Sequence, residues 1–312
     1  MKPALKKMRS SVIMSCLLAG ACLGATSGAR ADAFAQAILT IDNLRMLNSS
    51  GVAYLASDFH SVKGTNDGYA SATLDDVGSF APAKSFGVMD TRKPDVAHRF
   101  VGLPKPPRIE NDFTPFATPG PVPGTFGYAD QYMSGSLIGG GAKMQTRADA
   151  SVAQNGWAGG SSNTGTVTSF DFMLNAAGKV TFAFDATPFT QAYSTGNPET
   201  SAKANVTWNM SLRDLAGNEM LNLADLNKLH TWINDPSILA HTHDAPGLTT
   251  YAPGTLALSL STSMLTANTK YRLTINRASF ASATQDTAVP EPTSLAIFGL
   301  GLLGMTMLRR RG

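Results

Sequence analysis

A strict alternation of apolar and polar residues between positions 202 and 213 constrains the fold of this chain more than any other feature. Because successive side chains of a strand point to opposite faces, this period of two predicts a strand with one buried and one solvated face. We therefore expect Trp208 to be a core residue and Leu215–Glu219 to form a turn. The apolar members of the alternation are Ala202, Ala204, Val206, Trp208, Met210 and Leu212.

The same period recurs in other segments, namely Phe170–Leu174, Val180–Phe184, Leu256–Leu260 and Tyr271–Ile275. The turn-forming residues Asn175–Gly178 predict that the first two of these form a β-hairpin. Many alternating segments separated by Gly, Pro and Asn predict an all-β fold, an antiparallel β-sandwich or jelly-roll-like body. We expect one short helix, over Leu221–Trp232. Its apolar positions are Leu223, Leu226, Leu229 and Ile233.

Three segments interrupt the alternation. Pro104–Pro123 contains seven prolines, which favours an extended loop or a linker over a core strand. A linker would separate a small N-terminal part, but we expect residues 32–288 to form one irregular domain. The composition of Gly156–Gly165 is typical of a loop, and Asn66–Asp67–Gly68 predicts a turn.

The N-terminus has the organisation of a secretory signal peptide. Basic residues precede an apolar segment, Val12–Ala25, and Ala29-Arg30-Ala31 is a small-x-small cleavage site with Ala29 and Ala31 as its small residues. We expect signal peptidase to remove residues 1–31, so that the mature chain begins near Asp32. The basic residues before the apolar segment are Lys2, Lys6, Lys7 and Arg9.

Both cysteines of the chain, Cys16 and Cys22, lie inside this predicted signal. The exported body then has no disulfide, thiolate metal site or thiol nucleophile. Lipidation of Cys22 is the alternative, but Ala19 stands three residues upstream, where a lipoprotein signal has leucine.

The C-terminus contains three unlike elements in order. Pro290-Glu291-Pro292 is followed by the apolar run Leu295–Leu308 and by Arg309, Arg310 and Arg311. The run has about 14 residues, fewer than the roughly 20 of a normal transmembrane helix. Under the positive-inside rule the arginines stay in the cytoplasm and stop translocation. The run is therefore a marginal membrane-spanning helix that leaves the body outside.

These elements resemble the PEP-CTERM sorting signal of exported proteins in Gram-negative bacteria that make exopolysaccharide. The resemblance implies that exosortase cuts the tail at or near Pro290-Glu291-Pro292, so that the protein is held transiently in the inner membrane before it reaches the cell surface or extracellular matrix. An ordinary short C-terminal anchor is the alternative. Val180–Asp185, Val206–Asn218 and Lys270–Ile275 also resemble β-rich bodies that precede this signal.

Removing the terminal segments reverses the charge of the chain. Without the five basic residues of 1–31, and without Glu291 and the three arginines of the tail, 17 Lys and Arg remain against 21 Asp and Glu, a net charge of about −4. This body has no basic face suited to nucleic acid.

Candidate ligands for metal are sparse. His241, His243 and Asp244 are the densest cluster, and in an extended segment the two histidines share a face. The prolines that flank the cluster indicate an exposed loop instead. Asn66–Gly68 and Asp75-Asp76 offer oxygen ligands for calcium, without the spacing of an EF-hand. We therefore expect no cofactor, with calcium as the alternative.

No Gly-x-Ser-x-Gly or His-Glu-x-x-His motif is present. We therefore expect a non-catalytic structural protein of the cell envelope or of a biofilm matrix containing exopolysaccharide. A matrix adhesin that binds carbohydrate is the first alternative, with Trp157 in its glycine-rich segment as the residue that stacks on sugar. A secreted hydrolase is the second.

Overall fold

β-Strands make up nearly all of the described structure. The computed structural model describes residues 33–74, 77–87, 95–103, 111–116, 124–152, 158–195, 200–222, 240–243 and 247–285. The chain divides into two units, Met1–Arg30 and Ala31–Gly312, and all the described residues belong to the second. The predicted signal peptide, the sorting segment and residues 223–232 of the predicted helix lie outside these ranges. No helix within them is long and apolar enough to cross a membrane.

The strands are unusually long, and many span 12 residues or more. A single 3-10 turn, η1 (Ala56–Asp58), joins the first two. The strands are β1 (Ala33–Leu47), β2 (Phe59–Leu74), β3 (Val77–Gly87), β4 (Asp95–Leu103), β5 (Thr125–Ser136), β6 (Gly141–Val152), β7 (Ala158–Leu174), β8 (Thr181–Ser194), β9 (Thr200–Asp214), β10 (Ala240–His243), β11 (Gly247–Tyr251), β12 (Leu256–Ser261) and β13 (Lys270–Gln285).

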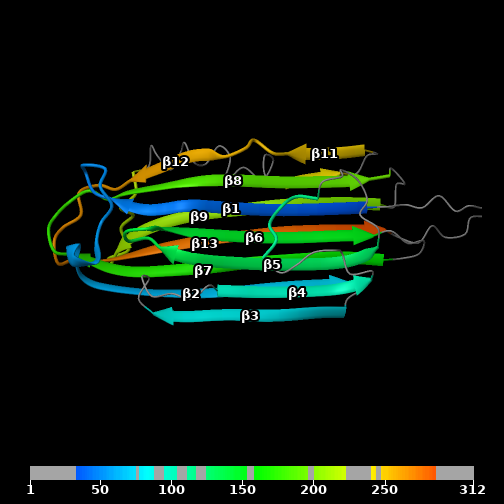
Figure 1. The fold of residues 1–312 in the computed structure, drawn as a ribbon, viewed down its shortest axis with the longest axis horizontal. Coiled ribbons are helices and arrows are strands. Elements are labelled where there is room, and N and C mark those ends of the chain that lie inside the picture. Colours follow the sequence, from blue (N-terminus) through cyan, green and yellow to red (C-terminus); the bar gives the residue numbers. More distant parts are fainter. Residues whose placement is uncertain are drawn as a thin grey trace, which may run out of the picture. The chain divides into compact units, whose positions relative to one another are not determined.

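The strands form two antiparallel sheets (Figure 1). Sheet A has the order β11-β8-β1-β6-β5-β4, with β12 also paired to β8, and sheet B has the order β10-β9-β13-β7-β2-β3. One hydrophobic core contains side chains from both sheets. The predicted antiparallel all-β fold is confirmed as a sandwich-like arrangement. β13, the last described strand, is central in sheet B because β9 and β7 pair with its two edges.

The core changes in character along the strands. Aromatic rings pack from one end to the middle of the strands: Phe172 lies 5.8 Å from Tyr271 at the end, and Phe184 lies 5.1 Å from Trp208 nearer the middle, measured between ring centroids. Trp208 is 2% exposed, which confirms the predicted core role. The other end is filled by small side chains. Its buried alanines are Ala33, Ala35, Ala37, Ala148, Ala150, Ala192, Ala202, Ala204, Ala281 and Ala283.

The predicted hairpin of Phe170–Leu174 with Val180–Phe184 is wrong. β7 pairs with β2 and β13 in sheet B, whereas β8 pairs with β1, β11 and β12 in sheet A. Residues 175–180 therefore connect the two sheets. Turn residues specify a local change of chain direction, but they do not specify which sheet the next strand joins.

Two predicted breaks are strand instead. Asn66–Gly68 lies inside β2, and Gly68 accommodates the buried amide of Gln131, whose Oε1 would lie 2.5 Å from a Cβ at position 68. Residues 158–165, predicted to be a loop, belong to β7 and pair with β13 on one side and mostly with β2 on the other. Pairing on both sides supplies backbone partners that a composition rich in Gly and Ser does not predict.

The proline-rich stretch connects neighbouring strands of one sheet. β4 and β5, which flank it, pair directly from Asp95↔Met133 to Leu103↔Thr125. Of the stretch itself, the structure describes residues 111–116. The strands before and after it belong to the same sheet A.

Candidate functional site

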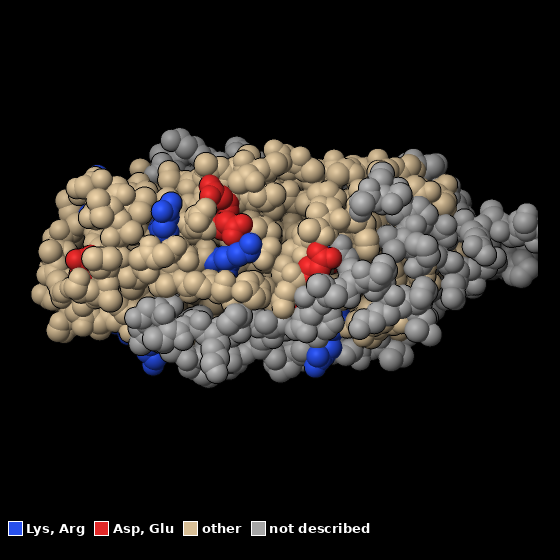
Figure 2. All heavy atoms as spheres, viewed as in Figure 1, with Lys and Arg blue, Asp and Glu red and all other residues tan. Residues whose placement is uncertain are grey.

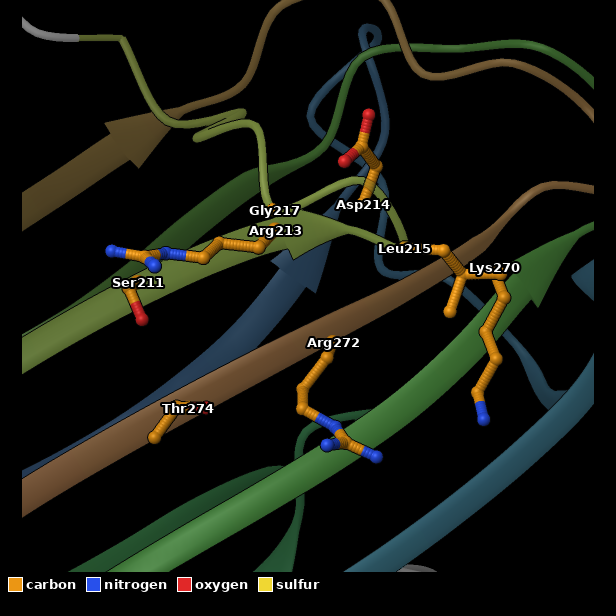
Figure 3. A pocket seen from close by; sticks show the side chains of 8 residues that line it. All are labelled: Ser211, Arg213, Asp214, Leu215, Gly217, Lys270, Arg272 and Thr274. Atoms are coloured by element: carbon orange, nitrogen blue, oxygen red, sulfur yellow. The ribbon is translucent and has the colours of Figure 1, made fainter.

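A surface hollow lies where β9 and β13 meet the turn that comes after β9 (Figure 3). It has a volume of about 260 Å³. The strand side chains that line it alternate with the buried residues Leu212, Tyr271 and Leu273, so they occupy the outer face of sheet B. The hollow is lined by Ser211, Arg213, Asp214, Leu215, Gly217, Lys270, Arg272 and Thr274.

The turn beside the hollow is the predicted turn of Leu215–Glu219, and side chains fix its shape. The carboxylate of Asp214 accepts hydrogen bonds from the Asn218 side chain at 2.8 Å and from the Asn218 backbone N–H at 2.9 Å. The side-chain hydrogen bond is the main reason why the pKa of Asp214 lies below its ordinary value. Gly217 has φ +86°, a conformation that glycine adopts without strain.

Charged residues form a row across sheet B at this level. Arg213 of β9 lies directly opposite Arg272 of β13, which lies opposite Asp171 of β7, which lies opposite Lys63 of β2. Like charges directly opposite each other on neighbouring strands destabilise a sheet. In Figure 3 the guanidinium groups of Arg213 and Arg272 extend away from each other.

The two arginines differ in how closely an acid pairs with them. Arg272 forms a short ion pair with Asp171, whereas the described acid beside Arg213, Glu219, is farther away. Arg272 donates to the Asp171 carboxylate from Nε at 2.7 Å and from Nη2 at 3.0 Å, and Lys270 Nζ lies 3.0 Å from the same carboxylate. The Arg272 hydrogen bond is the largest cause that lowers the pKa of Asp171, and it raises the pKa of Arg272. Arg213 Nε lies 3.6 Å from Glu219 Oε2, beyond hydrogen-bond distance.

A second charged cluster lies on the face of sheet A that points away from the shared core. It is nevertheless completely buried, because residues 111–116 cover it. Arg147 Nε donates to Asp149 at 2.7 Å, and both side chains are 0% exposed. Gln36 Nε2 donates to the other oxygen of Asp149 at 2.8 Å. We call Arg147, Asp149 and Gln36 the Arg147 cluster.

Residues 111–116 cover the Arg147 cluster and are bound to it through their backbone. Arg147 Nη1 donates to the carbonyl oxygens of Asp112 and Thr114, and the Phe116 N–H donates to Gln36 Oε1 at 3.2 Å. The Arg147 guanidinium also lies 5.1 Å from the centre of the Phe116 ring. Because its hydrogen bonds fix this segment, we assign the cluster a structural role.

The exposed surface of sheet A has few charges. Figure 2 shows this face, where neutral residues make up most of the described surface and acidic and basic side chains lie side by side near its centre. Lys143 and Asp42 form an exposed ion pair there at 3.4 Å. The hollow on sheet B therefore differs from this face in having three cationic side chains around one cavity.

The histidines of the predicted metal cluster lie in a strand, not in the exposed loop that their flanking prolines indicated. His241 and His243 belong to β10, where their backbones pair with Ala204 and Ala202 of β9. Asp244 lies outside the described residues, as do Asp75 and Asp76. Within the described ranges, no group of three or more His, Cys, Asp or Glu side chains is placed to hold a metal ion.

Most of the other predicted site residues also lie outside the described ranges. They are Trp157, the cleavage-site residues Ala29 and Ala31, the motif residues Pro290, Glu291 and Pro292, and Arg309, Arg310 and Arg311. No sequence motif selected Arg213, Lys270 or Arg272. Their alternation with apolar neighbours marks them as exposed, but only the register of β9, β13 and β7 brings them together.

Both ends of the described body lie at the alanine-filled end of the sandwich. Ala33, the first residue of β1, pairs with Ser194, and Gln285, the last residue of β13, pairs with Thr200. The Ser194 and Thr200 hydroxyl groups are hydrogen-bonded at 2.8 Å and link these two pairs. The incoming and outgoing chain are therefore close together.

Comparison with known families identifies the segment beyond Gln285. A family model described as the PEP-CTERM protein-sorting motif matches residues 288–311, beginning three residues after β13 ends. No curated protein matches the chain. The predicted resemblance is confirmed: the chain carries a PEP-CTERM motif at the C-terminal position expected for a substrate of exosortase, and this motif implies an exported protein that exosortase processes.

Proposed function

We propose that the body is a non-catalytic structural β-sandwich that is released by exosortase to the cell surface or into an exopolysaccharide-containing matrix. The observation that carries this proposal is that the sorting motif begins three residues after the last described strand, and that this strand ends at the end of the sandwich where the described body begins. A body attached in this way is held at one end only. Until the tail is cut, its other end is free to face outward.

The distance between the two ends supports display. β13 has 15 residue steps from Lys270 to Gln285, which at about 3.4 Å per step gives roughly 50 Å. The hollow at the start of β13 is therefore far from Gln285, where the strand ends.

The carboxylates beside the hollow support a role without catalysis. A general acid needs a pKa near the working pH, which usually means a raised carboxyl pKa. The pKa values of Asp171 and Asp214 are instead lowered by hydrogen bonds. Both groups are thus charged acceptors occupied by the protein itself, which disfavours the hydrolase alternative at this site.

The experiment compares wild type with two tail variants in host cells, each with an epitope in the body. Replacing Pro290, Glu291 and Pro292 together by alanine should leave an uncleaved precursor in the membrane fraction, because the protease no longer finds its site. Removing Arg309–Arg311 should weaken membrane retention before processing, since the charges that stop translocation are gone.

Immunoblots of the cell fractions and mass spectrometry of the mature termini give the result. Normal trimming and release of the triple-alanine variant would show that the tail is only an anchor. A mature protein that retains Met1 or Arg311 would contradict export with processing.

A further inference from the structure

We propose that the hollow between β9 and β13 binds the carboxylate of an acidic sugar, a hexuronate unit of a polysaccharide. The choice of a polysaccharide as the source of the carboxylate rests on the proposed function, whereas the anion site rests on the geometry of the hollow. The hollow is smaller than the roughly 300–1,000 Å³ of pockets for drug-sized ligands, so it suits one sugar unit of a chain that continues into solvent.

The opposed arginines favour an anion in the hollow. Arg213 and Arg272 are directly opposite in the register of β9 and β13, and their side chains are 61% and 62% exposed. An anion in the hollow can contact either guanidinium and reduces the repulsion between the two like charges. The guanidinium fork matches a planar carboxylate through two parallel hydrogen bonds.

Both arginines retain donors for a ligand. Arg272 uses Nε and Nη2 for Asp171, which leaves Nη1. Glu219 already accepts two backbone N–H groups, those of Leu212 and Leu221, and its other oxygen lies 3.6 Å from Arg213. An added carboxylate therefore does not have to break a short ion pair of Arg213.

Neutral groups in the hollow favour a sugar over a simple anion. Ser211 and Thr274 pair across β9 and β13 and place two hydroxyl groups in the lining, where they can bond to sugar hydroxyls. Leu215, 79% exposed, offers an apolar contact for the carbon face of a sugar ring. The sequence-derived net charge of about −4 repels polyanions from the body as a whole, so binding should be local to this cationic site.

The test measures binding of oligogalacturonate to the full chain, purified in mild detergent, by isothermal titration calorimetry. Methyl-esterified oligogalacturonate, which has the same sugar rings without the charge, is the ligand control. Polyglutamate tests for a carboxylate supplied by a protein. Arg213→Gln removes one guanidinium from the hollow, and Lys203→Gln makes the same change of charge at an exposed position of the same face of β9, outside the hollow.

We expect oligogalacturonate to bind, and Arg213→Gln to weaken binding by up to about fivefold, the upper end of the range for exposed charge pairs. Lys203→Gln should leave binding unchanged, and added salt should weaken it. No binding, equal binding of the esterified ligand, an equal loss in Lys203→Gln, or tighter binding of polyglutamate would each overturn the proposal. Because the assay needs no export, its failure is distinct from a failure of the tail variants.

Discussion

Asp171 forms ion pairs with two cations, Arg272 and Lys270, on the outer face of sheet B. Its carboxylate is 14% exposed and holds Arg272 and Lys270, while Lys63 lies opposite it on β2. Arg272 is 101 positions away in the sequence. No local pattern relates residues so far apart, which is why the alternation could predict that Arg272 is exposed but not what it contacts.

Asp171→Asn should destabilise the protein in a pH-dependent way. The folded pKa of Asp171 is lowered, chiefly by the Arg272 hydrogen bond. Its stabilising contribution is therefore complete above the unfolded pKa of about 3.9 and is lost as the pH falls through the folded pKa. Because Arg272 is largely exposed, we expect a loss of about 1 kcal/mol or less at pH 7.

Urea unfolding of wild type and Asp171→Asn between pH 2.5 and 7 measures this effect. The difference in unfolding free energy should shrink toward the acid end of the range. A difference that is constant with pH would show that the carboxylate charge is not what stabilises the fold.

Among the elements, the covering segment 111–116 depends most on a buried charge pair. The Arg147 cluster has no exposed surface, and the groups that contact its charges include each other, Gln36 and the carbonyl groups of the segment. Breaking a buried ion pair by removing one partner usually costs about 3–5 kcal/mol, whereas replacing both partners by apolar residues can cost far less.

We therefore expect Arg147→Leu and Asp149→Leu each to lower the unfolding free energy by about 3–5 kcal/mol. The double variant should lose less than the sum of the two. Limited proteolysis should also cut near residues 111–116 sooner in all three variants, because the segment loses its hydrogen bonds from Arg147 when Arg147 is replaced, and Arg147 loses the carboxylate that positions it when Asp149 is replaced. Additive losses with an unchanged cleavage pattern would show that the pair does not hold the segment.

At this scale the sequence predicted strands better than their connections. The alternation located β9, β12 and the start of β13 because a half-buried strand needs a period of two. The composition around Gly68 in β2 and in residues 158–165 of β7 predicted a turn and a loop. These residues are strand because they pair with strands far along the chain, which composition does not reveal. The hairpin prediction failed for the same reason.

For the molecule as a whole, the central position of β13 in sheet B makes this strand sensitive to substitution. β13 has a partner on both edges, whereas among the described strands β12 pairs with β8 alone. Proline removes a backbone N–H, and it is tolerated mainly in edge strands. The C-terminal strand should therefore be much less tolerant of proline than β12.

We expect Asn276→Pro in β13 to lower the unfolding free energy by at least about 1–3 kcal/mol, the cost of an unsatisfied buried backbone group. Ser259→Pro, at an exposed position of β12, should cost less. Thermal unfolding followed by circular dichroism compares the two. Equal losses would argue that β12 and β13 contribute alike to the fold.

The place of β13 also has a consequence for the order of events during secretion. In a chain that crosses a membrane with its N-terminus first, β2, β7 and β9 emerge before the strand that β7 and β9 share. Sheet B can close only when Gln285 has emerged, and the sorting motif begins three residues later. Under the proposed export, completion of sheet B and arrival of the motif at the membrane are therefore nearly simultaneous, so the earliest moment at which exosortase can act is also the earliest at which the sheet can be complete.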